Sequence, residues 1–424
     1  MTAKSTCRLV VTTLTVSLLG LLVSGRSAQA QAILTPRPEF SITPPAVQQY
    51  QANNQMEVFA PPETVTRPDP PPLQWGPLGF RPHAFYRFLH ATGLPAAGTN
   101  HVDSIVQEIS PGLLLNLGDH WSLDYTPTWR FYSNDEFRDT LDHYVRLIGG
   151  TTYEDWVFGL AQVYDASSEP LVETGTQTDQ EAFLTTLSSS YQFNSKMSMD
   201  LAINQNIVSA EEFQSSSEWS TLDWLNYQFW PRLDAGLGLG FGYVDVDTGS
   251  DMTYEQLQCR INWRATDKLS FRIHGGGELR QFLNGGADDV LNPVAGGVIQ
   301  YQPFDVTRLS LNVSHVVAVS LLSSGNAQSQ LTESTDVTGH LNQRLFQKVY
   351  VDLEGGYHVV TFVSAGTADT DREDDFYTFS AKLNCPFLKR GTAGVFYQYS
   401  DFSSTAEGYT YSSSQVGFEI GYRF

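Results

Sequence analysis

The last ten residues of the chain, 415-QVGFEIGYRF-424, decide the fold. Apolar residues stand at every second position, and small or polar residues lie between them; the apolar set is Val416, Phe418, Ile420, Tyr422 and Phe424. Because successive side chains of a β-strand point to opposite faces, one face of this segment is apolar and the other polar. The same period recurs at 121–130, 269–274, 309–314 and 349–354. Such segments predict the strands of an all-β, closed antiparallel transmembrane barrel.

Short turns and long loops alternate along the chain from about Phe80 onward. We expect short turns at 118–119, 152–154, 194–196, 230–232, 265–267, 304–305, 346–347 and 386–390. We expect long loops near 97 and at 134–140, 165–179, 210–217, 247–251, 284–290, 323–330, 365–373 and 403–408. This rhythm predicts about 18 strands, with 16 as the alternative, and both barrel ends on the periplasmic side. A soluble β-sandwich also alternates, but its strands are shorter and its connections less regular.

The composition agrees with an all-β chain. Hydrophobic residues make up 41% and charged residues 17% of the 424 residues, and the formal net charge is −21. The 34 Gly, 25 Phe and 20 Tyr favour strands and tight turns. This composition excludes a helical membrane protein.

Three segments are expected along the chain. Residues 1–30 have the features of a cleaved secretory signal peptide, with Lys4 and Arg8 before an apolar stretch and a small-x-small motif ending at Ala30. Residues 31–79 are rich in Pro and Gln and predict a disordered periplasmic segment. Residues 80–424 form the predicted barrel.

Charge and aromatic residues are unevenly distributed along the predicted barrel axis. Acidic residues crowd the long loops, as in 369–375, whereas basic residues such as Lys389 and Arg390 lie at the short turns. Aromatic residues such as Trp121 and Trp263 flank those turns, where an interfacial girdle is expected.

Charged residues of both signs fall on the inward-facing parity of the strands. The pore-lining candidates are Arg130, Arg260, Arg264, Arg272, Arg280, Arg344, Asp124, Asp234, Asp352 and Glu354. Such a wall can be a hydrated pore that orients polar solutes, or a set of salt bridges that fills and stiffens the lumen. The sequence leaves both interpretations open.

Motifs for catalysis are absent from the sequence. It contains no G-x-S-x-G, H-E-x-x-H, phosphate loop or Cys-x-x-Cys, and the inward-parity residues His274, His340 and His358 have no evident triad partner nearby. We therefore expect no enzyme and no cofactor.

One loop has the residue types of a calcium site. Asp245, Asp247 and Asp251 surround Gly249 at short spacing, and Ca²⁺ binds several oxygens at a tight turn. The distal Glu of a calcium loop is missing, so an acidic surface loop is the alternative to a bound Ca²⁺.

The alternating strands, the turn rhythm and the C-terminal Gly421-Tyr422-Arg423-Phe424 together resemble the outer-membrane β-barrel (porin-like) protein family of diderm bacteria over residues 80–424. The segments 110–118 and 123–129 are similar to segments of such proteins. The resemblance implies a bacterial outer-membrane location and insertion by the barrel assembly machinery, with Tyr422 and Phe424 in the insertion signal. It also implies contact with outer-membrane lipid and lipopolysaccharide, and a pore.

Two functions follow as expectations. The first is a channel for passive diffusion of small hydrophilic solutes, with a preference for cations because of its acidic loops. The alternative is a structural or anchoring barrel whose Pro-rich segment contacts peptidoglycan. No nucleic-acid partner is expected, and the sequence leaves the oligomeric state open.

Overall fold

A computed structural model describes residues 73–96, 101–171, 176–211, 213–283, 289–320, 331–346, 348–363, 372–388, 390–406 and 410–424. The signal-peptide prediction and most of the Pro-rich segment lie outside these residues. The strands are β1 (Leu73–Trp75), β2 (Leu78–Pro95), β3 (His101–Leu117), β4 (Trp121–Tyr132), β5 (Thr140–Tyr153), β6 (Trp156–Pro170), β7 (Gln177–Asn194), β8 (Met197–Ala210), β9 (Ser216–Trp230), β10 (Leu233–Val246), β11 (Met252–Thr266), β12 (Leu269–Phe282), β13 (Val290–Phe304), β14 (Thr307–Val319), β15 (Leu331–Leu345), β16 (Val349–Val363), β17 (Glu373–Phe387), β18 (Gly391–Ser404) and β19 (Tyr411–Arg423).

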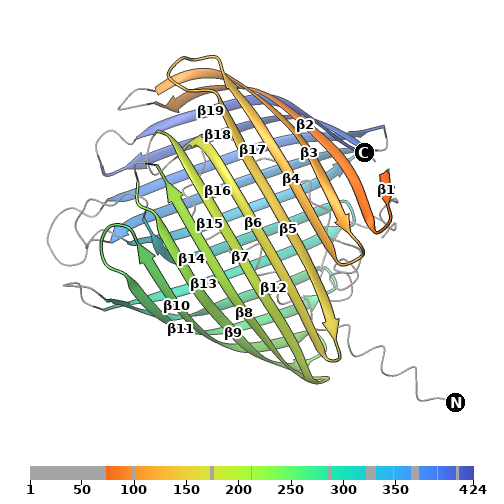
Figure 1. The fold of residues 1–424 in the computed structure, drawn as a ribbon, viewed down its shortest axis with the longest axis vertical. Coiled ribbons are helices and arrows are strands. Elements are labelled where there is room, and N and C mark those ends of the chain that lie inside the picture. Colours follow the sequence, from red (N-terminus) through yellow and green to blue (C-terminus); the bar gives the residue numbers. More distant parts are fainter. Residues whose placement is uncertain are drawn as a thin grey trace.

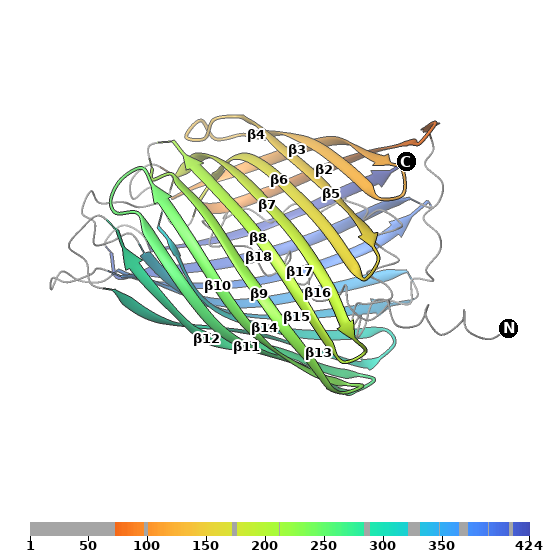
Figure 2. The same cartoon turned by 60° about the horizontal axis from the view of Figure 1, so that its bottom comes forward.

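The strands β2 to β19 form one closed barrel. Each is antiparallel to its sequence neighbours, and β19 pairs with β2 in a register that places Glu419 opposite Arg87. Figures 1 and 2 show the tilted strands wrapping around a common axis. The predicted closed antiparallel barrel of about 18 strands is confirmed, and the alternative of 16 is wrong.

The short β1 folds back on β2, where Leu73 pairs with Phe80 and Trp75 with Leu78. The ordered sheet thus starts before the expected boundary at Phe80. A second boundary also differs, because β6 continues to Pro170 and takes in Glu169, which was expected in a loop.

Turns and loops lie at opposite ends of the barrel (Figure 1). Each of the eight expected short turns falls at, or within two residues of, a connection between consecutive strands. The turn after β3 includes Gly118 at a φ of 63°, a left-handed conformation that costs glycine little.

The outward side chains of the barrel are mostly large and apolar. They include Ile109, Trp129, Leu187, Leu239, Phe241, Ile261, Tyr377, Val395, Phe418 and Ile420, all exposed. Cys259 and Cys385 are also exposed, and neither is in a disulfide. The predicted division into an apolar outer face and an inner face rich in polar groups is confirmed. Among the described residues, no helix is long and apolar enough to cross a membrane.

The inner face carries apolar side chains near the loop end. Leu89, Phe396, Phe402 and Tyr411 pack there in one buried cluster, which also takes in Phe137 from the loop between β4 and β5. The inner wall is therefore part apolar and part polar, which the alternation alone did not predict.

Candidate functional site: the inner wall of the barrel

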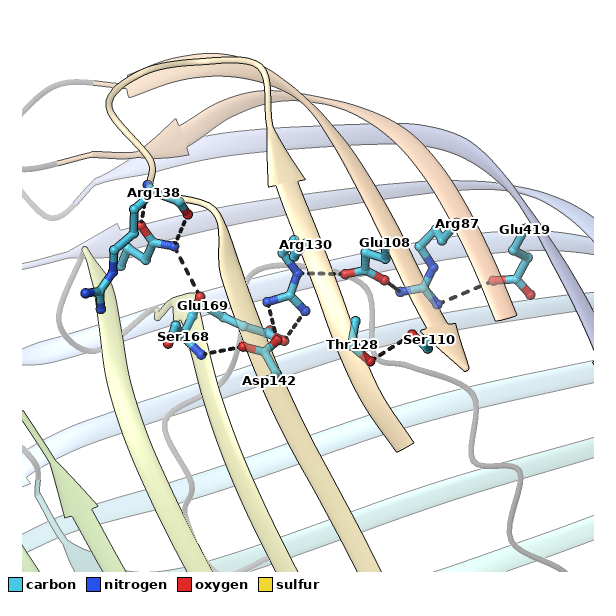
Figure 3. A network of polar contacts seen from close by, with 11 residues as sticks. Arg87, Glu108, Ser110, Thr128, Arg130, Arg138, Asp142, Ser168, Glu169 and Glu419 are labelled. Carbon is cyan, nitrogen blue, oxygen red and sulfur yellow. Dashed lines mark hydrogen bonds and ion pairs between the residues drawn. The ribbon is translucent and has the colours of Figure 1, made fainter. Parts of the chain in front are cut away.

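One side of the inner wall is an ion-pair network in which almost no side chain reaches solvent. Arg130 on β4 contacts Glu108 at 2.8 Å through Nε, and Asp142 at 3.0 Å and Glu169 at 2.6 Å through its two terminal nitrogens. Arg87 on β2 bridges Glu108 at 3.3 Å and Glu419 at 3.4 Å (Figure 3). Arg130 and Glu108 have side-chain exposures of 1% and 0%. Their charges are therefore stabilised by each other and not by water.

Glu419, at the β19 end of this network, also forms an ion pair with Lys382 on β17. The connected charges thus extend from β17 across the closing strand pair to β6.

A similar arrangement surrounds Arg260 on β11. Its guanidinium donates to Asp200 at 2.6 Å and to Asn226 at 2.7 Å, and it lies 4.4 Å from the ring centre of Trp224. The arginine is thus held by a carboxylate, an amide and an aromatic face at once.

Four of the pore-lining candidates are therefore buried and held by polar partners, three of them in ion pairs with carboxylates and Asp124 by a histidine. Arg130 and Arg260 belong to the networks above, Asp124 pairs with His83 at 2.9 Å, and Arg280 pairs with Glu278 at 2.7 Å. They face inward as predicted, and their contacts match the salt-bridge interpretation of the lumen.

The wall formed by β14 to β17 is different, because several of its charged side chains remain partly accessible. Asp352 accepts a hydrogen bond from Asn384 at 3.0 Å and lies 3.7 Å from His340. The side chains of His340 and Asp352 are 35% and 25% exposed, and Glu354 is exposed. His340, Asp352 and Glu354 are therefore polar groups of the inner wall that remain accessible.

The remaining pore-lining candidates occupy inward positions on other strands. Asp234 on β10 accepts a hydrogen bond from Asn262 at 2.7 Å. Arg264, Arg272 and Arg344 are half-buried, and within the described part of the chain none of the three forms an ion pair. The structure thus spreads the ten candidates around the wall and does not gather them into one site.

A serine, an aspartate and a histidine lie in one row across β14, β15 and β16. Ser314 donates to Asp336 at 3.3 Å, and Asp336 lies 2.5 Å from Nδ1 of His358. The carboxylate stands between the hydroxyl and the imidazole, so the imidazole is not placed to take the serine proton. This row therefore lacks the nucleophile and base contact that hydrolysis needs.

The three aspartates of the expected calcium loop lie at the end of β10 and directly after it. Asp245 lies within β10, and the carboxylate of Asp251 accepts a hydrogen bond from the backbone N–H of Val246 at 3.4 Å. The residues that the structure describes include no group of three or more His, Cys, Asp or Glu placed to share a metal ion. A calcium site at Asp245, Asp247 and Asp251 stays a prediction.

The C-terminal residues of the expected insertion signal lie at the closing strand pair. The rings of Tyr422 and Phe424 pack edge to face at 4.7 Å, and the backbone N–H of Phe424 donates to Pro82 at 2.9 Å. Their role in insertion stays a prediction.

Of the residues in the buried network, only Arg130 was among the candidates, and Arg87 and Asp142 show why others were missed. Arg87 lies in the run 85-FYRFL-89, where apolar residues occupy both faces and conceal the alternation. Asp142 follows the loop after β4. Acidic residues were expected there as part of the acidic loops and not as part of the inner wall. The strand pairing brings Arg87 to Glu108 and Asp142 to Arg130.

Comparison with known proteins gives similarity in architecture only. No protein-family model and no curated protein matches the sequence. Among solved structures, Acinetobacter baumannii OccAB3 is similar with a TM-score of 0.46 and 8% identity, over 81% of this chain and 99% of that one. Pseudomonas aeruginosa OccK2 (OpdF), solved in complex with glucuronate, has a TM-score of 0.46 and 10% identity, over 81% and 98%. The siderophore receptor PirA from Pseudomonas aeruginosa has a TM-score of 0.41 and 8% identity, over 81% and 80%.

What the structure itself establishes is the type of protein. A sheet that closes on itself leaves no unpaired edge, and this one presents apolar side chains outside and charged and polar side chains inside. The chain is an 18-stranded antiparallel β-barrel with the architecture that its resemblance to porin-like proteins implied.

Proposed function

We propose that the chain is a bacterial outer-membrane channel for the passive diffusion of small hydrophilic solutes. The observation that carries this proposal is the pairing of an apolar outer belt with the accessible polar wall on β14 to β17. The belt suits hydrocarbon, where every backbone polar group must be satisfied within the sheet. The polar wall suits water and dissolved solutes.

We further propose a preference for cations, set by the same wall. Asp336, Asp352 and Glu354 all face inward on β15 and β16, and each is at least partly accessible. The wall also carries bases: Lys382 on the neighbouring β17 pairs with Glu419 and is thereby partly neutralised, and Arg344 on β15 is half-buried. A carboxylate-rich accessible wall beside low-dielectric protein attracts cations and repels anions, and the effect weakens as salt screens it.

Conductance of the purified full-length protein in a planar lipid bilayer tests the channel. We expect stepwise ionic currents. A protein that inserts, shows heat-modifiable gel mobility and never conducts would overturn the channel and favour the anchoring alternative, in which the barrel displays acidic loops and the Pro-rich segment contacts peptidoglycan.

The reversal potential under a KCl gradient tests the cation preference. We expect the sign of the reversal potential to show that K⁺ permeates more readily than Cl⁻. We expect the double variant Asp352→Asn with Glu354→Gln to move the reversal potential toward zero. Glu136→Gln, which removes an exposed charge from the loop between β4 and β5, is the matched control. A reversal potential that favours Cl⁻, or one that the wall variant leaves unchanged, would contradict the proposal.

We also propose how the protein reaches the outer membrane. It is exported through a cleaved signal peptide, is inserted by the barrel assembly machinery and contacts lipopolysaccharide. The C-terminal Phe424 supports insertion by that machinery, because the resemblance to porin-like proteins rests in part on it. Fractionation of cells into soluble and outer-membrane material tests the location, and recovery of the mature protein from the periplasm in soluble form would contradict it.

A further inference from the structure

The strand pair that closes the barrel differs from every other pair in one respect. All other neighbouring barrel strands are consecutive in the sequence, so a turn or loop restricts their register. The strands β2 and β19 have no such connection, and the paired residues Arg87 and Glu419 are 332 positions apart. Something other than a turn must therefore select the register of this closing pair.

A row of four charged side chains crosses this pair with alternating sign. Glu419 on β19 is directly opposite Arg87 on β2, Arg87 is opposite Glu108 on β3, and Glu108 is opposite Arg130 on β4. Each neighbouring couple forms an ion pair. Figure 3 shows the four side chains in line across these strands. Directly opposed charges of unlike sign stabilise a strand pair, and like charges destabilise it.

This row of four charged residues distinguishes the observed register from the two nearest alternative registers. A slip by two residues keeps every side chain on its own face, so the apolar outer belt does not prevent it. In such a slip Arg87 would face Gly417 or Gly421, and Glu419 would face Phe85 or Leu89. Both charges would then be buried without their partner across the pair.

The burial of the row makes that loss severe. The side chains of Arg87 and Glu108 are 2% and 0% exposed, and that of Glu419 is 10% exposed. Water cannot replace the lost partner at such positions, so in a slipped register Arg87 would keep only Glu108 and Glu419 only Lys382.

We propose that Glu419, Arg87, Glu108 and Arg130, called here the seam row, select the register in which the first and last strands of the barrel close. The seam row thus has an assembly role that does not depend on whether the barrel conducts. It acts at the last pairing step, where the chain connectivity gives no guidance.

Disulfide cross-linking of the full-length protein reads the register directly. In a variant whose native cysteines are replaced by alanine, the outward pair Phe88→Cys with Phe418→Cys reports the observed register, because these residues are directly opposite. The pairs Phe88→Cys with Val416→Cys and Phe88→Cys with Ile420→Cys report the two slips. With the seam row intact, we expect cross-linking in the first pair and little in the other two.

The double variant Arg87→Gln with Glu419→Gln removes the charges that meet across the closing pair. We expect the slipped pairs to cross-link about tenfold more than with the row intact, since the hydrogen bond between charged groups that joins β2 and β19 is lost. The control is Ser414→Ala, which removes only a neutral 2.8 Å contact with Thr92 at the same strand pair. Slipped cross-linking that stays low in the double variant while Phe88→Cys and Phe418→Cys still cross-link, or that rises equally in the control, would overturn the proposal.

A further cysteine pair is needed if the barrel of the double variant does not close, because it shows whether the rest of the sheet has formed. Val395→Cys with Phe418→Cys reports the connected strands β18 and β19, whose residues are also directly opposite. Loss of the Phe88 and Phe418 cross-link with retention of this one places the failure at the closing pair and supports the proposal. Equal loss of both cross-links would show general misfolding and would overturn it.

Discussion

The substitution Glu108→Gln is the sharpest test of the buried network. Glu108 is fully buried and bridges two arginines, Arg130 at 2.8 Å and Arg87 at 3.3 Å. Glutamine keeps the size and shape of the side chain but removes its charge, so both guanidinium groups lose one carboxylate. No cavity forms, and the effect of the substitution is therefore electrostatic.

The size of the effect follows from what the two arginines retain. Removing one partner of a buried ion pair costs about 3–5 kcal/mol. Arg130 keeps Asp142 and Glu169, and Arg87 keeps Glu419, so we expect the lower end of that range. A loss of about 3 kcal/mol lowers the folding equilibrium constant roughly a hundredfold.

Urea titration in phospholipid vesicles, followed by heat-modifiable gel mobility and tryptophan fluorescence, measures this loss. Glu136→Gln is the matched control, because Glu136 is an exposed acid of the neighbouring loop and its substitution should change the free energy of unfolding by less than about 0.5 kcal/mol. If Glu108→Gln unfolds at the same urea concentration as the control, the network contributes nothing and the reasoning is refuted.

Three further predictions concern other parts of the barrel. Gly276→Ala should sharply reduce the yield of folded barrel in refolding assays, because its Cβ would lie 1.9 Å from a backbone oxygen, whereas Gly275→Ala meets nothing closer than 3.7 Å and should fold normally. Arg260→Ala should lower the free energy of unfolding by about 3–5 kcal/mol, since it leaves a buried carboxylate unpaired, and Arg232→Ala, which removes an exposed ion pair, by no more than about 1 kcal/mol. Deleting Phe424 should lower the amount of heat-modifiable protein in the outer membrane without changing its total synthesis, as quantitative immunoblotting would show.

Much of the fold was predictable because the barrel repeats a local rule. Alternation with a period of two depends only on which side of a strand a residue occupies, so Val416, Phe418 and Ile420 reveal their outward direction in sequence alone. The short turns were equally visible, because the chain reverses between two alternating segments at each of them.

The state of the inner wall was not predictable from the same rule. Alternation says that Arg130 and Glu354 both face inward, but not that one is buried among three carboxylates while the other is exposed. That difference depends on which strands the closed sheet brings together, and on the apolar cluster around Phe402 near the loop end. The position of Glu169 was wrong for a related reason, since the strand extends beyond the point where the sequence becomes polar.

Nitroxide scanning along β16, with the protein in lipid bilayers, tests the central claim most directly. Spin labels placed one at a time at positions 351–358 report collisions with oxygen, which concentrates in lipid, and with a water-soluble nickel complex. We expect the two collision rates to alternate in opposite senses with a period of two. The rate with oxygen should be highest at outward sites such as Leu353, and the rate with the nickel complex at inward sites such as Glu354. Equal access of the nickel complex to both faces would show that the outer face of the barrel is not in lipid, and would contradict the account.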